Sequence, residues 1–226
     1  MELPAWTDRL ERWLGDWSIP YLIRGLIGLN VLVWLLDGFS QSGDGSQSFA
    51  SFLYLHPDLV SQGEYWRMIT FLFIPSVGQS MLSPLFMLFF VFFTWFISDI
   101  LEGTWGSFKI TVYFLIGIVA INLTAFLAPS IGTNIFLMQS LLFCAAVLYP
   151  NVEITLFPIP IPIKLKWIGL FYAGMLTLSF LGSPPYRSMI LASLLPFALF
   201  IGPGTVQLIR ARRDAQARMK RFRGED

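Results

Sequence analysis

The feature that most constrains this chain is a series of six apolar runs. They cover residues 20–36, 84–101, 107–127, 133–149, 165–181 and 188–202. Each run is close to the length of about 20 apolar residues that a helix needs to cross the hydrocarbon core of a bilayer. The runs therefore predict an all-α polytopic membrane protein with six transmembrane helices.

The composition agrees with this interpretation and limits the number of domains. Charged residues make up 13% of the 226 residues and the mean hydropathy is +0.66, whereas a soluble domain carries about 25% charged residues. No polar stretch is long enough to build a core of its own. We therefore expect three parts: an interfacial helix at 1–19, a membrane domain at 20–205 and a basic tail at 206–226.

The first residues are expected to form an amphipathic helix rather than a cleavable signal peptide, because they lack a continuous apolar segment. Helical spacing places one set of apolar side chains on a single face: Trp6, Leu10, Trp13, Leu14 and Trp17. Tryptophans on one face are typical of a helix that lies at headgroup depth. An ordinary amphipathic helix packed on protein has the same pattern, and both interpretations stay open.

The loop after the first apolar run contains a second apolar segment, from Met68 to Pro75. It is too short to cross a bilayer alone, since about 20 residues are needed. We expect it to belong to a loop that is embedded in the outer leaflet.

The basic residues predict the orientation. Seven of them lie in the tail between Arg210 and Arg223, and an excess of lysine and arginine marks the cytoplasmic side. Six spans then place both termini in the cytoplasm. The tail either binds anionic lipid headgroups or serves only as a topology signal. A bacterial inner membrane is the expected compartment, and an endoplasmic-reticulum membrane is the alternative.

Three local patterns, in order along the chain, carry a resemblance to a known family. The first is Trp66-Arg67 in the loop after the first apolar run. The second is the turn from Glu102 to Gly106, where glycine permits a tight reversal of the chain. The third is the proline-rich segment 150–164, which is expected to be extended because proline is excluded from helix interiors.

Together the patterns resemble those of rhomboid intramembrane proteases and their derlin relatives over residues 60–205. The resemblance implies a six-helix bundle. In an active rhomboid a serine on helix four attacks the peptide bond, a histidine on helix six takes its proton, and polar groups on helix two hold the oxyanion. Matching this chain to that pattern places the nucleophile position on Ile135 and the two oxyanion positions on Phe86 and Phe90. The resemblance thus implies a fold without its protease chemistry, with bulky side chains filling the catalytic cavity.

Other polar residues in the apolar runs offer few substitutes for the missing catalytic serine and histidine. A displaced dyad of Ser140 with His56, the single histidine, requires the first loop to reach deep into the bundle. Gln139, Ser140 and Cys144 are better interpreted as a surface for helix packing or client binding. One histidine and one cysteine make no metal site, and no dinucleotide or phosphate-binding motif is present. We expect no cofactor and no nucleic-acid partner.

These observations favour a catalytically inactive rhomboid-like membrane protein. Such a protein would bind membrane lipids and transmembrane clients or a quality-control protease, and would perturb the local bilayer through short second and fifth helices. Two alternatives remain: a small transporter or channel-like protein, for which no mid-membrane charge or inverted repeat is seen, and a protease with a displaced active site.

Overall fold

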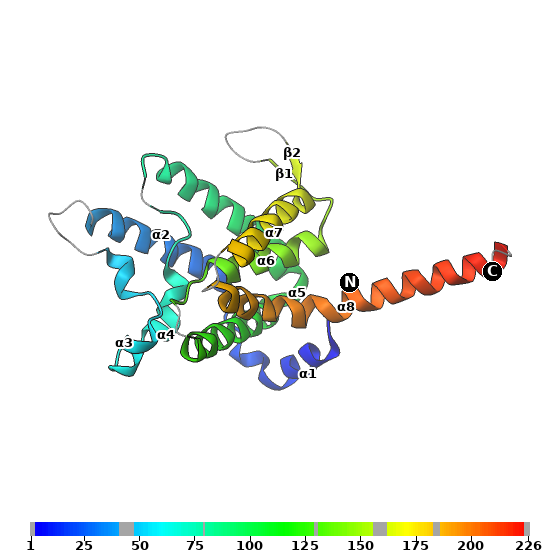
Figure 1. Cartoon of the computed structure of the whole chain (residues 1–226), viewed down its shortest axis with the longest axis horizontal. Helices are drawn as coiled ribbons and strands as arrows, with labels where there is room; N and C mark the ends of the chain where they lie inside the picture. Colours follow the sequence, from blue (N-terminus) through cyan, green and yellow to red (C-terminus); the bar gives the residue numbers. More distant parts are fainter. Residues whose placement is uncertain are drawn as a thin grey trace.

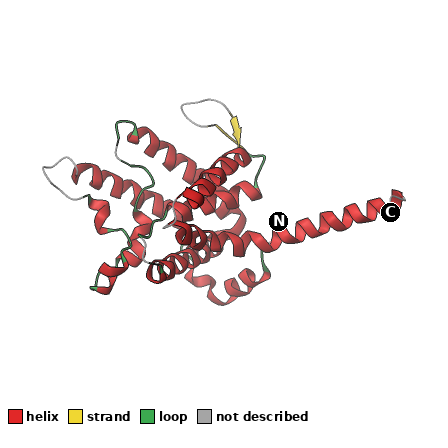
Figure 2. Ribbon diagram, in the orientation of Figure 1, coloured by secondary structure: helices red, strands yellow, loops and turns green. Residues whose placement is uncertain are grey.

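The computed structural model describes residues 3–40, 48–78, 80–128, 131–155, 162–182 and 186–223, with side chains up to residue 207. The chain is mostly helical (Figure 1 and Figure 2). Its elements are α1 (Ala5–Leu14), η1 (Gly15–Trp17), α2 (Leu22–Ser40), η2 (Phe49–Phe52), α3 (Pro57–Ser61), α4 (Arg67–Thr70), η3 (Phe71–Phe73), α5 (Ser83–Leu127), α6 (Ile135–Leu148), β1 (Glu153–Thr155), β2 (Pro162–Lys164), α7 (Leu165–Gly182) and α8 (Arg187–Arg223).

Among the described residues, four helices are long and apolar enough to cross a membrane: α2, α5, α7 and the 187–207 part of α8. The predicted span at 133–149 corresponds to α6, which is apolar but has 14 residues. The structure thus supports a membrane protein with four candidate spanning helices among the described residues.

The longest helix, α5, is broken at one glycine. Its 45 residues would extend about 67 Å if straight, more than twice the roughly 30 Å of a bilayer core. Gly106 has φ 77 and ψ 161 (in degrees), a conformation that glycine adopts readily and other residues avoid. Residues 83–105 and 107–127 form two arms that run in different directions (Figure 1). The break predicted at Gly106 is therefore confirmed.

An aromatic cluster holds the two arms of α5 against α8. Phe200 of α8 is 1% exposed, and its ring centroid lies 5.4 Å from those of Trp105 and Tyr113. Trp6 of α1 meets the same ring edge-on at 5.4 Å. Edge-to-face and tilted aromatic pairs at this distance add to the stabilisation from burial. The core therefore includes the N-terminal segment as well as the long helices.

The extended segment between α6 and α7 is confirmed in its described part. β1 and β2 pair antiparallel, with Glu153 opposite Lys164. The prolines at 158 and 160 lie outside the described residues.

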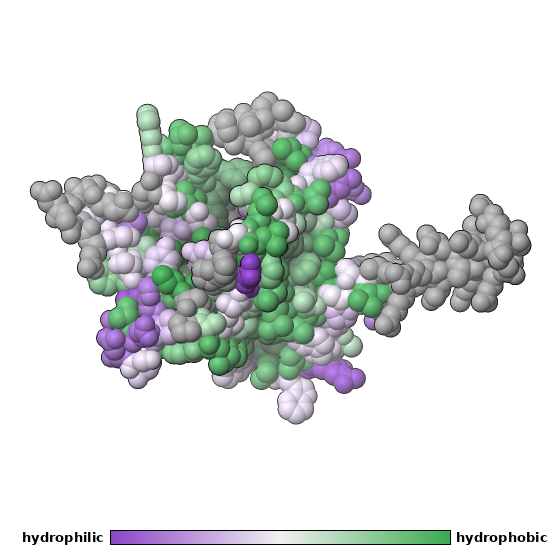
Figure 3. All heavy atoms as spheres, viewed as in Figure 1, coloured by the Kyte–Doolittle hydropathy of each residue, from purple (hydrophilic) through white to green (hydrophobic). Residues whose placement is uncertain are grey.

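Hydrophobic side chains cover most of the middle of the visible face, and hydrophilic ones gather mainly toward its two ends (Figure 3). The first-loop helices α3 and α4 lie at one end, and α8 extends from the other as a continuous helix to Arg223 (Figure 1). This distribution is typical of a protein whose middle part is surrounded by lipid.

Candidate functional site

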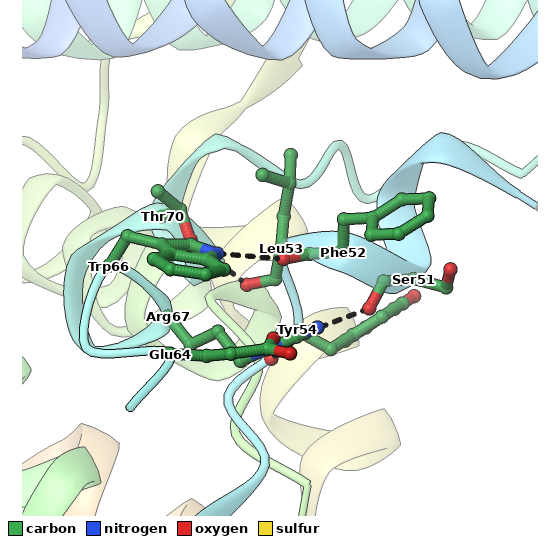
Figure 4. A network of polar contacts seen from close by, with 8 residues as sticks. All are labelled: Ser51, Phe52, Leu53, Tyr54, Glu64, Trp66, Arg67 and Thr70. Carbon is green, nitrogen blue, oxygen red and sulfur yellow. Dashed lines mark hydrogen bonds and ion pairs between the residues drawn. The ribbon is translucent and has the colours of Figure 1, made fainter. Parts of the chain in front are cut away.

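The loop between α2 and α5 is organised around Arg67. The guanidinium donates hydrogen bonds to the backbone oxygens of Ser51 and Tyr54, each at 2.9 Å, and to a Glu64 carboxylate oxygen at 2.5 Å (Figure 4). Its side chain is 4% exposed. The guanidinium is therefore bonded to protein groups and does not face the surroundings of the protein. Arg67 is a structural residue that joins both halves of the loop.

Its neighbour Trp66 has the opposite environment. The indole is 53% exposed and its Nε1 donates to the backbone oxygen of Phe52 at 3.4 Å. Thr70 adds a hydrogen bond to the Leu53 oxygen at 3.3 Å. Indole rings are enriched at headgroup depth, where one edge is polar and the ring is apolar. Of the Trp-Arg pair, only the tryptophan faces the surroundings of the protein.

Three asparagines also bond the first loop to the surrounding helices. Asn30 of α2 and Asn134, immediately before α6, both donate to the Leu72 oxygen, at 3.3 and 2.7 Å. Asn122 of α5 donates to the Met68 oxygen at 2.9 Å. Side-chain amides that bond across elements supply the partners that an irregular backbone lacks in an apolar interior. The backbone of the segment 67–73 is therefore bonded to the bundle, while Ile69 is 56% exposed. Its place in the outer leaflet stays a prediction.

One titratable group of this loop is perturbed. Burial raises the pKa of Tyr54 above its ordinary value, and the nearby charges of Asp37 and Tyr186 raise it further. Both effects disfavour the phenolate. Tyr54 therefore stays neutral at physiological pH and adds no reactive charge to the loop.

At the Gly106 turn, Glu102 joins α5 to the start of α2. One carboxylate oxygen accepts hydrogen bonds from the Tyr21 amide and the Ser107 hydroxyl, each at 2.8 Å. Tyr21 has a φ of 54 degrees, an unusual value for a residue other than glycine. The expectation that Glu102 pairs with backbone amides is thus met, and its role here is structural.

Lys109 does not pair with the acidic residues of that turn. Asp99 instead pairs with Arg24 at 2.6 Å, and Lys109 pairs with Asp8 at 2.7 Å and Glu11 at 3.4 Å. Lys109 therefore connects the bundle to the N-terminal helix, a contact that sequence spacing does not reveal.

The positions matched to protease chemistry do not converge on a shared cavity. Phe86 is 54% exposed, Phe90 is half-buried and Ile135 is 36% exposed. The expectation that these side chains fill an interior cavity is therefore wrong for Phe86 and Ile135. Neither isoleucine nor phenylalanine has a donor or a nucleophile, so the three positions supply no protease chemistry.

Ser140 is fully buried and already bonded. Its hydroxyl lies 2.7 Å from that of Tyr113 and donates to the Leu137 oxygen at 2.7 Å. The Cys144 thiol donates to the Tyr113 hydroxyl at 3.6 Å. Ser140 and Cys144 therefore form a polar contact between α5 and α6, whereas His56 lies in the first loop directly before α3. Gln139, the third predicted residue of this surface, is half-buried beside them.

A lateral groove of about 460 Å³ runs along α7, between this helix and its neighbours α6 and α8. Gly169, Ala173 and Thr177 line it at intervals of four residues, and so lie on one face of α7. The Thr177 hydroxyl donates a hydrogen bond to the Ala173 oxygen at 2.8 Å, so its partner lies within the same helix. Small residues therefore form one strip of the groove along α7, and larger apolar side chains such as Phe143, Leu194 and Phe197 form the rest of its lining.

Within the part of the chain that the structure describes, no three His, Cys, Asp or Glu side chains gather as a metal site. Searches for related proteins gave no identification: no family model, no curated protein and no solved structure matches this chain.

Proposed function

We propose that this chain is a catalytically inactive, rhomboid-like membrane protein that binds the transmembrane segments of other proteins. The proposal rests on the lateral groove beside α7. Residues that let two helix backbones approach closely favour helix association in membranes. Ala173 and Thr177, one turn apart on α7, present such a surface in the groove, while Gly169 on the same face is buried against Ala146. Only 17% of the apolar window of α7 is buried, the smallest share among the four candidate spans.

The proposal includes six membrane crossings. The arms of α5 on either side of Gly106 are about 34 Å and about 31 Å long, each matching a bilayer core. With α2, α6, α7 and α8 they make six. The basic residues of the tail then place both termini in the cytoplasm by the positive-inside rule, with a bacterial inner membrane as the proposed compartment.

The surroundings of Ser140 support the absence of protease activity. A nucleophilic serine needs a general base within hydrogen-bond reach and a position for the reacting carbonyl. The Ser140 hydroxyl has the Tyr113 hydroxyl and a backbone oxygen as its neighbours. A phenol, with an ordinary pKa of about 10, is a poor base at neutral pH.

The length of α7 also supports a modest thinning of the bilayer beside the groove. The 18 residues of α7 extend about 27 Å, slightly less than an average hydrocarbon core. The expected short second helix is not found, because the first arm of α5 has its full length. The shortest of the proposed crossings, α6, has half of its 14 residues buried within the bundle. Thinning is therefore proposed only beside α7, where a partner helix would enter the groove.

Photo-crosslinking in native membranes tests the binding site. We expect p-benzoylphenylalanine at Leu170, which lines the groove, to capture membrane proteins. Leu115 is the matched control, because it is similarly exposed but lines a second apolar groove between α2 and α5. Ala173→Leu fills the first groove and should reduce capture from position 170 by roughly threefold or more. Equal capture from both positions would contradict the proposed site.

Activity-based labelling tests the catalytic part. We expect no reaction of the purified protein with a serine-directed fluorophosphonate, because Ser140 is buried and bonded. Labelling that disappears in Ser140→Ala would show an active serine and overturn the pseudoprotease proposal.

A further inference from the structure

The N-terminal helix α1 is attached to the bundle by its acidic side. Asp8 and Glu11 both pair with Lys109, at 2.7 and 3.4 Å, and Thr7, which precedes Asp8 in the helix, is 2% exposed. Trp6 adds the ring contact with Phe200. These contacts fix the rotation of the helix about its axis.

Beyond Trp6, the apolar side of α1 therefore points away from the bundle. Trp13 is 89% exposed, and Trp17 in the following η1 turn is 80% exposed. Leu10 and Leu14 on the same side are 38% and 47% exposed. A helix packed on protein buries its apolar side and exposes its charges. Here Trp13 and Leu14 are exposed although Asp8 and Glu11 face Lys109, which argues against a helix whose whole apolar side is packed on protein.

The location of α1 indicates what covers this apolar side. The segment after it is fixed to the Gly106 turn, since the Ile19 amide donates to the Thr111 hydroxyl at 3.0 Å and the Tyr21 amide to Glu102 at 2.8 Å. Charged groups gather at this level: Arg24 pairs with Asp99, and Lys109 with the helix itself. Charged side chains lie at helix ends near the membrane surface rather than at mid-membrane.

We propose that α1 and η1 bind the headgroup region of the bilayer that the protein spans, with Trp13 and Trp17 inserted at the boundary of the acyl chains. Indole rings prefer this depth. Arg9 and Arg12 of the same helix are exposed, and their guanidinium groups are available to bond lipid phosphates. The Lys109 ion pairs orient the helix by holding its acidic side on the bundle. This inference does not depend on the proposed client binding.

Depth-dependent quenching tests the proposal on the full chain. In a Cys144→Ala background, a single cysteine at position 13 or 12 is labelled with bimane, and the protein is reconstituted in phosphatidylcholine vesicles with or without phosphatidylglycerol. Position 12 is the matched control, because it is an exposed position on the charged side of α1. We expect lipid-borne doxyl groups to quench the label at 13 at least about threefold more than the label at 12, and aqueous iodide to show the opposite preference.

Two outcomes would overturn the proposal. Equal iodide quenching at positions 12 and 13 would place the apolar side in water, and protection of position 13 from both quenchers would mean that protein covers it. If Trp13→Cys does not fold, Trp17→Cys reports on the same side. Lys109→Gln should reduce the difference between positions 12 and 13, because the orienting ion pairs are lost.

Discussion

Replacing Arg67 with alanine is expected to lower the free energy of unfolding by about 3 kcal/mol. The substitution removes a guanidinium that is 4% exposed, and leaves the oxygens of Ser51 and Tyr54 without their donor. The Glu64 side chain is 33% exposed, so water compensates part of the loss there. Unfolding in mixed micelles with increasing SDS measures the change.

Two variants sharpen this prediction. Arg67→Lys retains the charge but not the planar set of donors, and should recover only part of the stability. Trp66→Ala should change the free energy of unfolding by less than about 1 kcal/mol, because its indole is half exposed and makes one long hydrogen bond. If Arg67→Ala unfolds at the same SDS fraction as the parent, Arg67 does not stabilise the loop.

The second large effect is expected where α7 meets α6. A Cβ atom on Gly169 would lie 2.7 Å from the Cβ of Ala146, which cannot move without its backbone. Overpacking of this kind costs about 1–3 kcal/mol. Gly169→Val should therefore destabilise the protein by about 2 kcal/mol and weaken any capture from the adjacent groove. The same SDS titration measures the loss.

Gly174→Val is the matched control on the same helix, because nothing lies within 4 Å of a Cβ at that position. We expect its free energy of unfolding to stay within about 0.5 kcal/mol of the parent. Equal destabilisation by both substitutions would indicate a general effect of valine on α7. Only a selective loss at position 169 supports the close α6–α7 contact.

The sequence predicted the apolar helices and the break at Gly106 because both depend on local properties. Run length and hydrophobicity determine whether a segment forms a membrane helix, and a sharp reversal needs a residue that tolerates positive φ. The helix expected among the first residues is found at Ala5–Leu14, followed by a 3-10 turn at Gly15–Trp17. Bounds differed mainly at α8, whose continuous helix passes from the apolar run into the basic tail.

The candidate site was less predictable, since its polar residues depend on contacts between distant segments. Arg67 beside Trp66 is typical of an interfacial pair, yet the oxygens that bury its guanidinium lie 13 and 16 residues earlier. Ser140 and Cys144 four residues apart predict a common helix face. That this face meets the Tyr113 hydroxyl follows only from the packing of α5 on α6.

The sequence by itself determined the class of protein, the apolar helices and the lack of nucleophile and donor at Ile135, Phe86 and Phe90, because these are properties of composition and side-chain chemistry. Only the tertiary structure decided which way α1 faces and where the groove beside α7 lies. Both depend on where separate helices meet: Lys109 orients α1, and the approach of α7 to α6 at Gly169 borders the groove.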